Sequence, residues 1–296
     1  MAARYTDLAL EAHELWRQAS GAQTLQGTEQ SEHRREGFGV TRVLVRTEEA
    51  SRLLGKPRGV YLTLDLRGRE TMENGETRAA RAVAAELRTL PPLRRGAKRA
   101  LVVCLGSAAM TPDALGPRAA AHILVTRHLS AQLPSLTAVS VLTPGVLGST
   151  GLEAAEQARG AVRAVHAELV IAIDALASQR LGRVCTTVQL SDTGIIPGSG
   201  VGNHRGALTQ ETLGVPVVAV GVPTVVDAAT LALDVLEEAG APLPPRGTLA
   251  GAPRALMVTP RSIDAQVSAL ARIVGLGVSA ALHPSLSPEE LALLTN

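Results

Sequence analysis

Aromatic side chains are almost missing from this sequence of 296 residues, where phenylalanine, tryptophan and tyrosine together make up 1%. Apolar residues nevertheless account for 46%, with alanine, valine and leucine in the majority. A chain of this length can bury a substantial core, and an aliphatic core is typical of helices packed on a sheet. The composition therefore predicts one large domain or two small ones.

An excess of charge is also missing. The formal net charge is +2, too small to indicate a nucleic acid or a membrane surface as partner. The N-terminus lacks the apolar region of a secretion signal, and no continuous apolar run is long enough to span a bilayer. Two cysteines, Cys104 and Cys185, lie in apolar runs and are predicted to be buried free thiols. These absences predict a soluble cytoplasmic protein.

Several catalytic motifs are missing too. The seven histidines show no metal-ligand spacing, and no Gly-x-Ser-x-Gly elbow is present. Gly198, Gly200 and Gly202 lack the spacing and the following helix of a phosphate-binding fingerprint. We therefore expect no metal and no cofactor, and no serine hydrolase chemistry.

What the sequence does contain is a regular alternation of strands and helices from about residue 37 onward. Apolar and two-residue patterns predict strands at 40–47, 60–68, 100–105, 138–142, 168–173, 183–191, 215–223 and 255–260. Three-to-four spacing predicts helices at 75–90, 113–129, 151–166, 227–240 and 262–282. This order predicts an α/β fold with a mostly parallel sheet and helices on both faces. The first 35 residues are polar and predict irregular structure.

Two acids follow predicted strands directly. Asp113 comes after strand 100–105, and Asp174 ends strand 168–173. Asp113 could instead cap a helix, with Thr111 as N-cap and Pro112 in the first turn, whereas an acid that ends a buried strand needs a partner or a task. If the two strands are parallel neighbours, both carboxylates face one crevice beyond their carboxyl ends. Such a pair can share a proton and activate a water molecule.

A third region of interest is "SDTGIIPGSGVGN", residues 191–203. Its Asp192, Thr193 and Gly194 repeat the tripeptide of pepsin-like proteases, but the α/β context favours a turn that shapes the crevice wall. Asp192 and Thr193 are therefore supporting candidates. Asp227 also follows a strand, and it could equally cap the helix that begins there.

Long ordered blocks resemble one family, the germination proteases that degrade small acid-soluble spore proteins. They include "YTDLALEA", "KPRGVYLTLD", "TPDALGP", "VIAIDALAS", "TTVQLSDTGIIPGSGVGN", "ETLGVPVVAVGVPTVVDA" and "LMVTPRSID". The resemblance implies an aspartic-type endopeptidase with a three-layer fold like that of the hydrogenase-maturation proteases. It also implies that Asp113 and Asp174 are the essential acids, that the enzyme is a homotetramer, and that it works in the cytoplasm of the forespore or spore core.

The resemblance further implies an inactive zymogen that removes its own leader. Family substrates are cut after the acid of a motif like Thr-Glu-Phe/Ile-Ala, which Thr6, Asp7, Leu8 and Ala9 resemble. We expect cleavage between Asp7 and Leu8, so that 1–7 is a propeptide and 8–296 a single α/β catalytic domain. The alternative is that this stretch only begins an amphipathic helix.

Two departures from the family pattern are visible. The loop at 241–253 is short where the family has a long insertion, and Ile196 stands where relatives often have His. The hydrogenase-maturation proteases use a His with two acids to recognise nickel, so Ile196 argues against a metal. Two other functions are considered: a hydrogenase-maturation-type endopeptidase, and a non-catalytic α/β binding protein in which both acids are helix caps.

Overall fold

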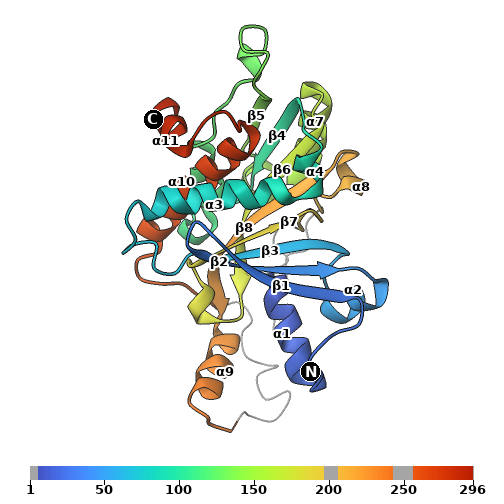
Figure 1. Cartoon of the computed structure of the whole chain (residues 1–296), viewed down its shortest axis with the longest axis vertical. Coiled ribbons are helices and arrows are strands. Elements are labelled where there is room, and N and C mark those ends of the chain that lie inside the picture. The colour runs from blue at the N-terminus through green and yellow to red at the C-terminus, as the bar shows by residue number, and fades with distance from the viewer. Residues whose placement is uncertain (1–5, 197–205, 243–255, 296) are drawn as a thin grey trace.

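The computed structural model describes residues 6–196, 206–242 and 256–295 (Figure 1). Its strands are β1 (Thr28–Arg35), β2 (Phe38–Val45), β3 (Gly59–Asp65), β4 (Arg99–Cys104), β5 (Ala138–Leu142), β6 (Leu169–Ser178), β7 (Thr187–Ser191), β8 (Val217–Asp227) and β9 (Met257–Val258). Its α-helices are α1 (Ala9–Ser20), α2 (Glu48–Leu54), α3 (Gly75–Thr89), α4 (Pro91–Arg94), α5 (Leu115–Ala120), α6 (Leu147–Thr150), α7 (Ala154–Val165), α8 (Gln210–Leu213), α9 (Ala228–Glu238), α10 (Ile263–Leu282) and α11 (Pro288–Leu294). Its short 3-10 turns are η1 (Thr111–Asp113), η2 (Arg127–Leu129) and η3 (Leu181–Arg183).

All these strands form one sheet in the order β1-β2-β3-β7-β8-β6-β4-β5, with β9 paired to β8. The predicted α/β class is confirmed, but the sheet is mixed rather than mostly parallel. β5, β4, β6 and β8 are parallel, and β7, β3, β2 and β1 continue the sheet in antiparallel pairs. Apolar periodicity identifies a strand but does not give its direction, which explains the difference.

Strand β1 lies inside the region that the sequence predicted to be irregular. It forms a hairpin with β2 through Glu36 and Gly37, both at positive φ, as a tight hairpin turn requires. Its central residues are exposed and polar because it is an edge strand, so the hydrophobic pattern of a strand is absent. The predicted helix 113–129 is also wrong in extent, since only α5 within it is α-helical.

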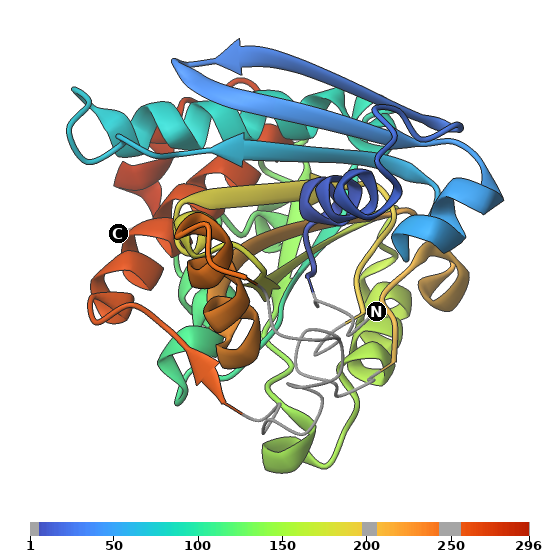
Figure 2. The same ribbon diagram turned by 90° about the horizontal axis from the view of Figure 1, so that it is seen from below.

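Helices cover both faces of the sheet, as predicted. On one face α3 and α10 lie side by side (Figure 1), and α5 packs against α10. The alanines, valines and leucines of these helices form the main core with alternate residues of β4, β6 and β8. On the other face α7 and α8 cover the parallel strands. Helices α1 and α2 pack on β2 and β3 on that same face (Figure 2). The result is a three-layer arrangement with an aliphatic core.

The core contains both cysteines and the long apolar helix α10. Cys104 and Cys185 are free and buried, as predicted, and burial raises the pKa of their thiols to about 12 and about 11. By length and composition α10 could cross a membrane, although its apolar residues do not form one continuous run. However, 72% of that stretch is buried in the protein, as expected of a central core helix.

Helix α5 lies so close to the end of β4 that a side chain cannot fit between them. A Cβ atom on Gly116 would lie 2.2 Å from the Leu105 carbonyl oxygen. We expect Gly116→Ala to lower the free energy of unfolding by about 1–3 kcal/mol, because backbone atoms would have to move. The matched control is Gly160→Ala at an exposed position of α7, where a Cβ meets nothing within 4 Å and a gain of about 0.5–1 kcal/mol is expected. Urea unfolding of both variants measures the difference, and equal stabilities would contradict this description of α5.

Candidate active site

Asp113 is held at the end of β4 by the loop that follows the strand. The Ser107 N–H donates to its Oδ2 atom at 2.8 Å and to its carbonyl oxygen at 3.1 Å. Gly106 has a φ of 107°, and a Cβ there would lie 2.0 Å from the Asp113 carbonyl oxygen, so only glycine allows this close approach. Neither η1 nor α5 has a side-chain N-cap, so the capping interpretation of Asp113 and Thr111 is wrong.

Asp174 lies within β6, which extends four residues beyond it. Its side chain is buried, and its Oδ1 accepts a hydrogen bond from the Ala175 N–H at 2.9 Å. Strands β4 and β6 are parallel neighbours, as the sequence argument required, and η1 packs against β6 and β8. The fold therefore brings the turn that carries Asp113 to the strand that carries Asp174.

A row of paired residues extends from Asp174 across the sheet. Asp174 pairs with Gly221 of β8, and Gly221 pairs with Gln189 of β7, so both side chains point to the same face. At a strand spacing of about 4.8 Å, the Cα atoms of Asp174 and Gln189 are about 10 Å apart. Gly221 has no side chain, and the Leu176 side chain of β6 fills the space above it, with Cδ1 2.3 Å from where a Cβ atom would lie.

A cavity of about 800 Å³ opens on this face of the sheet. Gln189, Gly221 and Leu176 contribute sheet residues to it, and residues 193–196 form part of its wall. Thr193 and Gly194 of the Asp-Thr-Gly turn thus line this cavity, whereas Asp113 and Asp174 are not among its lining residues. Ile196 lines the cavity with 44% of its surface exposed.

The chain's own N-terminal segment, defined here as residues 6–9, borders this cavity. The Asp7 N–H donates to the Ala177 carbonyl oxygen at 3.0 Å, and the Ala177 N–H donates to Asp7 Oδ2 at 2.8 Å. The Asp7 carbonyl oxygen accepts from Lys56 Nζ at 2.9 Å and from Gln189 Nε2 at 3.2 Å. Leu8 is fully buried. The segment is therefore bound through both its main chain and its side chains.

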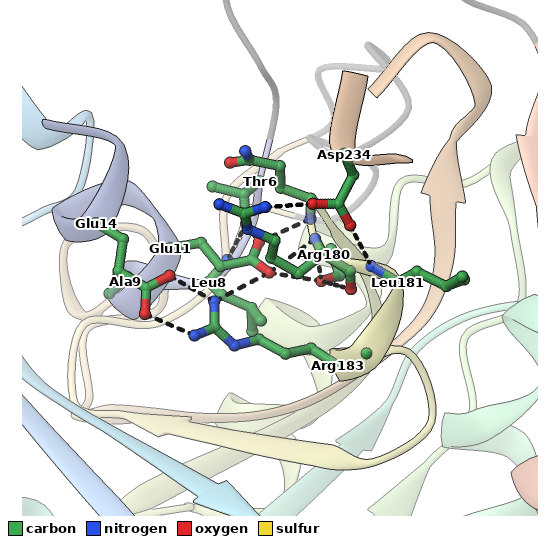
Figure 3. Close-up of polar contacts among 12 residues, drawn as sticks. Thr6, Leu8, Ala9, Glu11, Glu14, Arg180, Leu181, Arg183 and Asp234 are labelled. Carbon is green, nitrogen blue, oxygen red and sulfur yellow. Dashed lines mark hydrogen bonds and ion pairs between the residues drawn. The ribbon is translucent and has the colours of Figure 1, made fainter. Parts of the chain in front are cut away.

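Glu11 anchors helix α1 immediately after this segment (Figure 3). Its carboxylate is 1% exposed and accepts from Ser178 Oγ at 2.7 Å, the Gln179 N–H at 2.7 Å and the Arg180 N–H at 3.1 Å. The Thr6 hydroxyl also donates to it, and Arg183 lies 3.3 Å away. Arg180 in turn pairs with Asp234 of α9. These contacts fix α1 to the end of β6.

The remaining candidate residues have clear structural roles. Asp192 accepts from the Val60 N–H at 2.7 Å and so joins the end of β7 to β3, while burial raises the pKa of its carboxyl. Thr193 donates to Ser191 at 3.3 Å and lines the cavity. Asp227 is the N-cap of α9, since its side chain accepts from the Thr230 N–H at 2.9 Å. The capping interpretation of Asp227 is therefore confirmed.

Among the residues that the structure describes, no group of three or more His, Cys, Asp or Glu side chains could hold a metal ion. The glycines at 198, 200 and 202 and the short loop at 243–253 lie outside the described residues.

Comparison with known proteins shows the family. The model of the family described as germination protease matches residues 9–238, which is most of the chain. The chain belongs to the germination protease family. Membership confirms the resemblance seen in the motifs and supports an endopeptidase of spore germination. It also decides against the hydrogenase-maturation-type alternative.

Individual germination proteases match this chain over nearly its full length. The germination protease of Caldanaerobacter subterraneus subsp. tengcongensis is 40% identical, with 97% of this chain and 96% of the relative covered. That of Clostridium perfringens is 36% identical, with 98% of each chain covered. The alignment with the Bacillus cytotoxicus germination protease, 34% identical, covers 98% of this chain and 96% of the relative. That alignment runs over 355 positions, so the relative contains residues that this shorter germination protease lacks.

Among solved structures, a NiFe hydrogenase maturation protease, HycI, from Thermococcus kodakarensis matches with 16% identity and a TM-score of 0.34. The match covers 63% of this chain and 96% of the other.

Three polar residues of this germination protease that contact the N-terminal region were not singled out in the sequence: Lys56, Gln189 and Glu11. All three lie in sequence blocks that resemble the family, but the resemblance assigned none of them a role. Gln189 offered one signal, because it is the polar amide in the strand "TTVQLS" and buried amides need partners. Lys56 and Glu11 lie far from their partners in sequence, so only the fold reveals them.

Proposed function

We propose that this chain is a self-processing zymogen of an aspartic-type endopeptidase that starts the degradation of small acid-soluble spore proteins. One observation carries the proposal: residues 6–9, which resemble the cleavage motif of the family's substrates, are bound at the cavity on the sheet row that contains Asp174. In this view the enzyme holds its own leader as it would hold a substrate.

The proposed chemistry uses Asp113 and Asp174 as a pair. The ionised carboxylate takes a proton from a water molecule as the water oxygen attacks the carbonyl carbon. The other carboxyl, which is protonated, donates a hydrogen bond to the scissile carbonyl oxygen, and the leaving amine takes a proton from the pair when the carbon–nitrogen bond breaks. Two close carboxylates favour a shared proton, and mild acid favours this singly protonated state. Neither step needs a metal or another cofactor.

Cleavage between Asp7 and Leu8 would remove residues 1–7 and leave 8–296 as a single catalytic domain. Helix α1 would stay in place, because Glu11 and its partners all lie after the cleaved bond except Thr6. The proposed setting is the cytoplasm of the forespore or spore core. We also propose a homotetramer, which the sedimentation of purified protein would test.

An intact-mass time course of the full-length protein tests this function. The protein is moved from neutral to mildly acidic buffer containing dipicolinate, and we expect the loss of residues 1–7 with Leu8 as the new terminus. A new terminus at any other residue would contradict the assigned bond. An unchanged mass, together with no cleavage of added small acid-soluble spore protein, would reject the protease and favour the non-catalytic binding protein.

A further inference from the structure

The carbonyl group of Asp7 is the one that cleavage at Leu8 would attack, and it is held by two donors from separate elements. Lys56 follows α2 and donates to the Asp7 carbonyl oxygen at 2.9 Å, while Gln189 of β7 donates to it at 3.2 Å. Lys56 also donates to the Thr6 carbonyl oxygen at 3.0 Å. Both distances to the Asp7 oxygen are those of real hydrogen bonds.

The orientation of the Gln189 amide follows from its neighbours. Its Oε1 accepts from the Ala9 N–H at 2.7 Å, and a backbone N–H can only donate. The oxygen of the amide must therefore face Ala9, which leaves Nε2 to donate to Asp7. Gln189 is buried, and through these two hydrogen bonds it contacts the main chain on both sides of the bond between Asp7 and Leu8. This arrangement recognises an extended backbone without regard to side chains.

Lys56 adds positive charge at the same carbonyl. It lines the cavity, and desolvation lowers the pKa of its ammonium group, although the nearby carboxylates of Asp7 and Glu11 oppose that effect. An ammonium group removed from water interacts strongly with oxygen atoms that gain negative charge. Its position on the Asp7 oxygen is therefore suited to stabilising an oxyanion.

We propose that Lys56 and Gln189 form the oxyanion site of this enzyme, first for its own bond between Asp7 and Leu8 and later for the scissile carbonyl of its protein substrate. The inference rests on the proposed function and adds to it the groups that stabilise the transition state. When the water oxygen bonds to the Asp7 carbon, the carbonyl electron pair moves onto the oxygen. Lys56 Nζ and Gln189 Nε2 stabilise that charge, and the pair returns as the bond to the Leu8 nitrogen breaks and the nitrogen takes a proton.

Two substitutions test the site. Lys56→Met keeps the length of the side chain and removes the charge. Gln189→Glu keeps an acceptor for the Ala9 N–H and replaces the donor to Asp7 by an oxygen. Removal of one oxyanion donor typically slows catalysis by about 10²–10³-fold. We expect each variant to lose residues 1–7 at a rate lower by about that factor.

The control is Lys98→Met, which changes the only other lysine of the sequence, an exposed one, and should process at the wild-type rate. Thermal unfolding checks that each variant folds. Hydrogen exchange of residues 6–20 reports whether the segment stays bound. If Gln189→Glu processes slowly while hydrogen exchange of residues 6–20 stays at the wild-type rate, the result supports the oxyanion site.

Two results would overturn this inference while leaving the proposed function intact. One is that both variants lose residues 1–7 at a rate within threefold of the wild-type rate. The other is that processing slows only by the factor by which hydrogen exchange of residues 6–20 becomes faster, because the loss of binding would then explain the slower processing. Absence of processing in the wild-type protein would instead reject the proposed function, and the oxyanion site with it.

Discussion

Replacing Asp174 by Asn is expected to abolish the loss of residues 1–7 while the protein remains folded. The side chain keeps its size, and its amide oxygen can still accept the hydrogen bond from the Ala175 N–H. Under the proposed function, what disappears is the group that exchanges a proton with water. Loss of an essential acid or base reduces the rate by at least about 10²–10⁴-fold, and by more when the residues act as a unit. Asp113→Asn should have the same effect, and the double variant should be no slower than either single variant.

The chain offers a matched control for this experiment in Asp227. It also follows a strand and accepts a backbone N–H, but its partner is the first turn of α9. Asparagine is as good an N-cap as aspartate, so Asp227→Asn should process normally and unfold at nearly the wild-type temperature. Intact mass and thermal unfolding of the three variants provide the measurements. Normal processing in Asp113→Asn or Asp174→Asn would remove that acid from the mechanism.

Replacing Glu11 by Gln is expected to cost about 3–5 kcal/mol of unfolding free energy. The buried carboxylate accepts hydrogen bonds from Ser178, Gln179 and Arg180. A neutral amide would leave at least one of these donors unsatisfied and would leave Arg183 without a charged partner at this position. The measurement is urea unfolding at neutral pH, with Asp174→Asn also present so that residues 1–7 remain attached.

Glu14 is the matched control, because it lies on the same helix and pairs with the same Arg183. Its oxygens lie 2.6 and 2.8 Å from the guanidinium nitrogens, but its side chain is 36% exposed. Exposed ion pairs contribute at most about 1 kcal/mol, so Glu14→Gln should have a small effect. If the two variants lost equal stability, burial of Glu11 would not explain its contribution.

The elements that contain an apolar pattern could be predicted from the sequence. Strand β5 and helices α3, α7 and α10 were found within a few residues, because their buried faces repeat at two or at three to four residues. Strand β1 could not be found, because it takes its pairing from β2 and exposes polar side chains. The antiparallel half of the sheet was missed for a related reason, since strand direction depends on partners distant in the chain.

The same distinction applies to the site. Asp113 and Asp174 could be selected because each follows an apolar run of the sequence, although Asp174 proves to lie within β6, the parallel neighbour of β4. Lys56 and Gln189 meet at the Asp7 carbonyl only after α2 and β7 have taken their places in the fold. Asp7 is 49 positions from Lys56 and 182 from Gln189, and contacts between residues so far apart have no local sequence pattern.

The order of strands in the sheet has a consequence for protein synthesis. Residues 6–9 bind to residues 177 and 189, and β8 lies between the two strands that contain those residues. On the ribosome the N-terminal segment therefore emerges long before its binding place exists, and β8 must be synthesised before β6 and β7 are held together. Pairings between distant parts of a chain form late in folding. Under the proposed function, a nascent or truncated chain cannot cut itself, and cleavage begins only in molecules whose sheet is complete.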